Sequence, residues 1–128
     1  MQRPHVRVVL GTLTDAHTDV VVRPGRRARA DGRTITVVAP RWHPPTGPDR
    51  ALAQAYRDAV AAADACRARS MALPAILARG AWPLDQVTRI ALTVLLSTPS
   101  TVREVQIIAS TPAMVERWAE ALVREPSR

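Results

Sequence analysis

The residues best suited to chemistry follow an apolar segment near the middle of the chain. Residues 70–76 have the pattern of a short buried strand, residues 77–82 of a tight loop, and residues 83–96 of an amphipathic helix. In α/β proteins the amides of such a loop and the helix N-terminus point at the carboxyl end of the strand and favour an anion there. The segment therefore predicts a site for a phosphate or a similar anion.

Two side chains in this loop bear on that prediction. Arg79 lies beside Gly80, where its guanidinium could bind an anion together with backbone amides or could be solvated at the tip of the loop. Trp82 could stack on a base or a ribose, or it could pack beneath the loop. Both alternatives stay open at the level of sequence.

Basic residues are concentrated between two predicted strands. The densest cluster has one acid, Asp31, and five arginines: Arg23, Arg26, Arg27, Arg29 and Arg33. All 18 basic residues are arginine and the net charge is +7, so the surface attracts phosphates and polyanions. We weigh polyanion binding through Arg26, Arg27 and Arg29 against a merely solvated loop. Strongly GC-biased coding would also explain an arginine-rich chain that has no lysine.

Groups that could bind a metal or act in catalysis are scattered. His5, His17 and His43 have no acid or cysteine at ligand spacing, so we expect no metal and no cofactor. The single cysteine, Cys66, excludes an intramolecular disulfide, and its place on a helix face predicts a buried or half-buried thiol and not a nucleophile. The sequence has no paired carboxylates in a loop and no nucleophile motif, which disfavours an enzyme.

The spacing of apolar residues predicts the elements that position these groups. Strands are expected at residues 5–10, 18–23, 34–39, 70–76 and 102–109, helices at 49–67, 83–96 and from 112 onward, and an exposed loop at 26–33. Strands that alternate with helices indicate an α/β fold with a mixed, mostly parallel sheet. The length of 128 residues suits one domain, residues 1–128. No apolar run reaches the roughly 20 residues of a membrane span, and we expect a cytoplasmic protein.

Several of these segments, in this order and spacing, resemble the macro domain family. They are the run 34–42, the helix around 51–57, the strand 70–76, Trp82-Pro83-Leu84 and the strand 105–108, with residues 11–14 and 18–22 similar to the opening strand pair of the family. The resemblance spans about residues 6–123. It implies a three-layer α/β/α sandwich whose cleft binds ADP-ribose or a related nucleotide, and some members of the family hydrolyse ADP-ribose esters.

The chain departs from the macro domain pattern where the ligand would be held. Thr12 stands in place of the aspartate that recognises adenine, and Arg23-Pro24-Gly25-Arg26 in place of the asparagine-containing motif that positions the distal ribose. The glycine-rich phosphate loop and the helix behind it are missing. The resemblance thus implies a degenerate binding module without the usual hydrolysis. Its ligand-binding residues would be Thr12, Arg23, Arg26, Ile76, Leu77, Ala78, Arg79, Gly80, Ala81 and Trp82.

An alternative is an interaction protein that kept the fold, lost the pocket, and binds a protein partner or a polyanion. The missing helix would leave part of the sheet uncovered, and large exposed apolar patches are rare on monomers. We therefore expect a homodimer formed through the uncovered face. Its candidate contacts are Val20, Val22, Ile35 and Val37.

Overall fold

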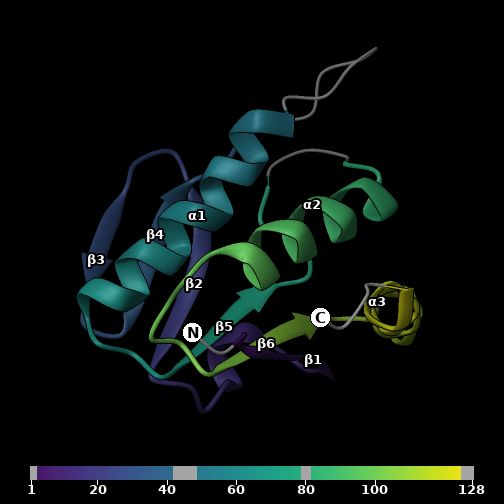
Figure 1. Cartoon of the computed structure of the whole chain (residues 1–128), viewed down its shortest axis with the longest axis horizontal. Helices are drawn as coiled ribbons and strands as arrows, with labels where there is room; N and C mark the ends of the chain where they lie inside the picture. Colours follow the sequence, from purple (N-terminus) through teal and green to yellow (C-terminus); the bar gives the residue numbers. More distant parts are fainter. Residues whose placement is uncertain (1–2, 42–48, 79–81, 125–128) are drawn as a thin grey trace.

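A six-stranded sheet organises the chain in the computed structural model, which describes residues 3–41, 49–78 and 82–124 (Figure 1). The strands are β1 (His5–Leu10), β2 (Val20–Gly25), β3 (Arg29–Asp31), β4 (Thr34–Val38), β5 (Ser70–Pro74) and β6 (Glu104–Ala109). Their order across the sheet is β1-β6-β5-β2-β4-β3. All neighbours pair in parallel except β3 and β4, which are antiparallel. The predicted α/β class with a mixed, mostly parallel sheet is confirmed.

Residues 26–33 are exposed as predicted, but the prediction of a loop is wrong, because this segment contains β3. Ala30 of β3 pairs with Ile35 of β4 across a turn at Gly32, whose φ of +60° lies in the left-handed region that favours glycine. Asp31 pairs with Thr34, so Gly32 and Arg33 are the two central residues of the turn, and glycine at the first of these positions favours a two-residue hairpin. The link between β2 and β3 is short and carries no helix: residues 26–28 join the two strands directly.

Three helices bury their apolar stripes against one face of the sheet. They are α1 (Asp49–Ala65), α2 (Leu84–Ser97) and α3 (Pro112–Arg124). In Figure 1, α1 and α2 lie across the near side of the sheet and α3 is seen end-on beside β1 and β6. The largest fully buried side chains of the shared core include Trp118 of α3 and Tyr56 of α1. No helix of the described ranges is both long and apolar enough to cross a bilayer.

Local sequence explains where α3 begins. Thr111 precedes the helix, and its Oγ1 accepts a hydrogen bond from the amide of Met114, at 3.2 Å. Pro112 follows at the first helical position, where no amide donor is required. Thr111 is therefore the N-cap of α3.

The second face of the sheet is covered differently. A 3₁₀ helix, η1 (Leu13–Asp15), follows β1, and Leu13 packs on a small cluster formed by Ala16, Ala72 and Ile108. Within residues 3–41, 49–78 and 82–124, none of the three α-helices contributes to this cluster. The flanking layer on this side is therefore reduced to η1 and its neighbours.

The proposed contacts of a dimer are wrong. Val20, Val22, Ile35 and Val37 are each at most 3% exposed, because they face the helices within the core. Side chains alternate between the two faces of a strand, so an assignment that is shifted by one residue places the buried side chains on the exposed face. Homodimer formation itself stays a prediction.

Candidate functional site

Strands β2 and β5 are neighbours in the sheet and run in parallel. They pair at their amino-terminal ends, Val20 with Met71 and Val21 with Ala72. Ligands of open α/β sheets bind beyond the carboxyl ends of the strands. That Arg23 and the segment after β5 bind one ligand stays a prediction.

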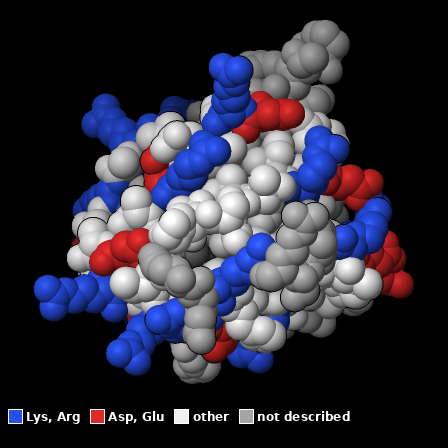
Figure 2. All heavy atoms as spheres, in the orientation of Figure 1, with Lys and Arg blue, Asp and Glu red and all other residues white. Residues whose placement is uncertain are grey.

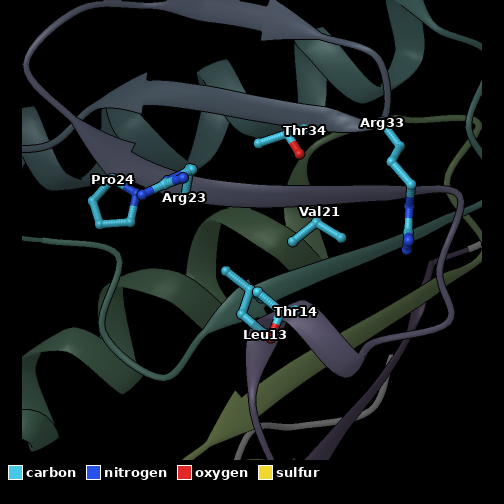
Figure 3. Close-up of a pocket in the computed structure, with 7 residues that line it drawn as sticks. All are labelled: Leu13, Thr14, Val21, Arg23, Pro24, Arg33 and Thr34. Carbon is cyan, nitrogen blue, oxygen red and sulfur yellow. The ribbon is translucent and has the colours of Figure 1, made fainter.

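A hollow of about 450 Å³ lies on the second face of the sheet, beside η1 (Figure 3). It is lined by Leu13, Thr14, Val21, Arg23, Pro24, Arg33 and Thr34. In Figure 3, Val21 and Thr34 come from neighbouring strands, Leu13 and Thr14 face them from η1, and the two arginines lie toward opposite ends. The hollow therefore combines apolar carbon, hydroxyl groups and positive charge.

The two arginines of the hollow differ in their partners. The Nη2 of Arg33 donates to the carbonyls of Ala16 and Thr18, at 2.8 Å each, and so holds the segment after η1 against the sheet. Arg23 is exposed and makes no ion pair with an acid of the described ranges. Arg23 is thus the arginine that can meet an anion without breaking an internal contact.

The segment after β5 is anchored from two sides. The amide of Ala75 donates to the carbonyl of Ile108 at 3.0 Å, and the Nε1 of the fully buried Trp118 donates to the carbonyl of Ala75 at 3.1 Å. Beneath this segment the hydroxyl of Tyr56 is completely buried, and burial raises the pKa of Tyr56. The edge of the site at β5 is therefore held by core side chains.

Comparison with known proteins identifies this architecture. Residues 16–91 match the family model of the macro domain, which is more than half of the chain. The chain belongs to the macro domain family. It is 32% identical over 90 residues to the macro domain-containing protein SCO6450 of Streptomyces coelicolor, an alignment that covers 69% of this chain and 53% of that protein. The chain thus spans about half the length of this relative.

Solved macrodomains share the fold at low sequence identity. The Oceanobacillus iheyensis macrodomain with ADP matches with a TM-score of 0.74 at 17% identity, over 91% of this chain and 88% of that one. The Trypanosoma brucei macrodomain in complex with ADP matches with a TM-score of 0.72 at 12% identity, over 92% of this chain and 69% of the other. The sheet with its flanking helices is therefore the macrodomain fold.

Thr12 does not line the hollow that holds Arg23. Its Oγ1 donates to Oδ2 of Asp15 at 2.7 Å, and it lines a second hollow of about 300 Å³ together with Arg7, His17 and Gln106. Thr12 can therefore accept a hydrogen bond from a ligand as it stands, but it can donate one only if its bond to Asp15 is broken. Its neighbours Leu13 and Thr14 line the Arg23 hollow instead.

The residues predicted after β5 are only partly described. Ile76 and Ala78 are half-buried and the side chain of Leu77 is in the core, so Leu77 can offer a ligand only its backbone. Arg79, Gly80 and Ala81 lie outside the described residues. The role of these residues in ligand binding stays a prediction.

Stacking by Trp82 is not supported by the structure. The ring of Trp82 is 5% exposed, and its Nε1 donates to the carbonyl of Pro40 at 3.2 Å. The indole offers no open face to a base, and the alternative of packing in the core is the one observed. The apolar residues next to Trp82 in the sequence do not distinguish stacking on a base from packing in the core.

The arginines of the turn between β2 and β3 are accessible. Arg26 and Arg27 are exposed, and Arg29 lies 3.5 Å from Asp31 in an ion pair of which both side chains are 74% exposed. Such an exposed pair contributes little to stability. Polyanion binding by Arg26, Arg27 and Arg29 stays a prediction.

Metal-ligating and nucleophilic groups are not gathered in the part of the chain that the structure describes. Within it, no three His, Cys, Asp or Glu side chains are grouped as metal ligands. Cys66 was expected to be buried or half-buried, but it is exposed, because α1 ends at Ala65 and Cys66 lies in the turn beyond it. An exposed cysteine by itself gives no catalytic site.

Several lining residues of the hollow were missed by the prediction of site residues: Leu13, Thr14, Val21, Pro24, Arg33 and Thr34. The signal for Val21 was present, because it shares strand parity with Arg23. Arg33 reaches carbonyls 15 and 17 residues away in sequence, and no local pattern predicts such a contact.

Proposed function

We propose that this macro domain binds ADP-ribose, or a related nucleotide that carries a phosphate, in the hollow beside η1 and without hydrolysing it. The macro domain family and the relatives solved with ADP or with ADPR support a ligand of this class. The volume of about 450 Å³ lies in the usual range for small-molecule sites. The observation that carries the proposal is the exposed, unpaired guanidinium of Arg23 at a hollow with apolar walls.

Each lining group has a role in this proposal. Arg23 contacts phosphate through charge-assisted hydrogen bonds, which suit a planar guanidinium. Leu13, Val21 and Pro24 supply apolar contact for a ribose or a base. Thr34 contributes a hydroxyl that can donate or accept a hydrogen bond.

Hydrolysis is not part of the proposal because the groups for it are missing. The chain contains no asparagine, and the nearest hydroxyl in the opening motif, that of Thr12, already donates to Asp15. A general base must reach the proton that it removes, and no carboxylate lines the Arg23 hollow. We therefore expect ligand binding without release of product from an ADP-ribose ester.

Calorimetry with ADP-ribose at low and physiological salt tests this function. We expect saturable one-site binding that persists in salt, and Arg23→Gln to weaken it by roughly 10- to 100-fold, the loss of about 1.5–3 kcal/mol for hydrogen bonds to a charged group. Arg103→Gln is the matched control, because Arg103 is also an exposed arginine but precedes β6 and does not line the hollow. Absence of heat from the folded protein, or equal binding by both variants, contradicts the proposal.

A second candidate is polyanion binding through the turn between β2 and β3. The exposure of Arg26, Arg27 and Arg29 favours it, because exposed arginines release counterions when they neutralise phosphates. The test is binding of single-stranded homopolymers across a salt series. A steep salt dependence that is lost when the three arginines are replaced by Gln supports this function, and salt-independent binding or none contradicts it.

A further inference from the structure

A groove runs between α1 and α2 on the outer surface of the helices, away from the sheet. It has a volume of about 320 Å³ and is lined by Asp49, Arg50, Ala53, Arg57, Arg89, Ile90, Thr93 and Val94. Its floor is apolar, since Ala53 and Ile90 are half-buried and Val94 is buried. Figure 2 shows this face, with blue arginines around a pale band over the two helices.

Three arginines border the groove and give its lining a net positive charge. Arg50, Arg57 and Arg89 are exposed, and none of them makes an ion pair with an acid in the described ranges. Of the acids nearby in sequence, Asp85 pairs with Arg117 of α3. Asp49 also lines the groove, and its Oδ1 accepts a hydrogen bond from Nε2 of Gln86, a neutral donor that leaves the negative charge in place. The groove therefore offers three positive charges and one negative charge around an apolar floor.

The spacing of these arginines matches a helical partner. Arg50 and Arg57 are seven residues apart on α1, which places them two turns and about 10.5 Å apart along one side of the helix. Ala53 lies between them on the same face. A partner helix that carries two carboxylates at the same separation, with apolar side chains between them, would meet both the charges and the floor.

We propose that the α1–α2 groove binds an acidic amphipathic helix of a partner protein. The apolar side chains of that helix lie on Ala53, Ile90 and Val94, and its Asp or Glu side chains pair with Arg50, Arg57 and Arg89. This is recognition of a helix by a groove, in which apolar anchors give affinity and charges give orientation. The apolar floor favours a helix over a nucleic acid, whose phosphates would leave Ile90 without a partner.

This surface is separate from the nucleotide hollow. The hollow lies on the second face of the sheet, between η1, β2 and β4, whereas the groove lies outside the helices that cover the first face. No residue lines both. The two proposals can therefore fail or succeed independently.

The test uses a synthetic helical peptide of about 14 residues, or four turns, with Glu seven positions apart and Leu at the positions between them that face the groove. Titration into isotope-labelled protein is followed by amide NMR shifts. We expect shifts confined to α1 and α2, with a dissociation constant on the order of 100 µM or tighter, and binding at least tenfold weaker when the two Glu are Gln. ADP-ribose is expected to leave these amides unshifted.

Variants of the protein make the test specific. Arg57→Glu should abolish binding of the acidic peptide, and Arg103→Glu, which makes the same charge change outside the groove, should leave it within about twofold. Ala53→Glu is the second variant, which blocks the floor without removing an arginine. Three outcomes would overturn the proposal. The acidic peptide does not bind at millimolar concentration, the Gln peptide binds equally well, or a single-stranded oligonucleotide shifts the amides of the groove and the peptide does not.

Discussion

Replacement of Trp118 by Phe tests how much the hydrogen bond between α3 and the end of β5 contributes to stability. Trp118 is completely buried in α3, and its Nε1 donates to the carbonyl of Ala75 just beyond β5. Phe retains the aromatic contact with the core but cannot donate a hydrogen bond. The substitution therefore isolates the anchor between α3 and the end of β5.

The expected loss of stability has two parts. A carbonyl left without a donor in the core costs ~1–3 kcal/mol. The smaller ring removes apolar volume of roughly one to two methylene groups, which adds ~1 kcal/mol. The free energy of unfolding should therefore fall by ~2–4 kcal/mol. This is a large part of the total free energy of unfolding of a typical domain, about 5–15 kcal/mol.

Urea denaturation followed by far-UV circular dichroism measures this loss, because that signal does not depend on tryptophan. With a slope of ~2 kcal/mol per M, the middle of the usual range in urea, the midpoint should fall by about 1–2 M. Val123→Ala is the control, since Val123 lies on the same helix but is 86% exposed and should change stability by less than ~0.5 kcal/mol. A loss below ~1 kcal/mol for Trp118→Phe would refute the reasoning, because it would mean that the Ala75 carbonyl finds another donor.

Two further predictions concern the sheet and the helices. Gly25→Ala should destabilise the protein by ~1–3 kcal/mol in the same assay, because a Cβ at Gly25 would overlap Cγ2 of Thr36. The additional substitution Thr36→Ser removes that methyl group and should restore most of the lost stability. If the double variant is no more stable than Gly25→Ala, the clash is not the cause. The hydrogen bond from Arg117 holds the pKa of Asp85 below its ordinary value. The pair therefore stabilises the fold at neutral pH. This stabilisation is lost as the pH falls through the lowered pKa of Asp85. NMR titration of the carboxyl should show the Asp85 pKa returning toward its ordinary value in Arg117→Gln, and an unchanged pKa would contradict the pairing.

The periodic parts of the fold were accessible from the sequence. The strand at residues 5–10 is observed with the predicted bounds, and α1, α2 and α3 begin within one or two residues of their predicted starts. Their apolar residues recur with the helical period, so local pattern alone defines the buried stripe. The order of strands and helices then indicated a mostly parallel α/β sheet.

The site was predicted only in part because its contacts are long-range. Arg23 could be chosen from the sequence, since the macro domain resemblance places it in the motif that positions the distal ribose. The donation by Arg33 to Ala16 and Thr18 joins segments whose proximity depends on the folded sheet. Burial of Trp82 likewise depends on the carbonyl of Pro40, which is 42 residues away in sequence.

The sequence by itself determined the three helices, five of the six strands, their order and the macro domain resemblance, because these depend on local periodicity and spacing. Only the tertiary structure decided which face of the sheet the helices cover. Strand alternation separates Val20 and Val22 from Val21 and Arg23 but does not say which pair faces the core. The helices pack on the face of Val20 and Val22, and this choice leaves Val21 and Arg23 to line the hollow. The physical reason is that alternation is a local property, whereas burial is decided by the segments that pack on each face.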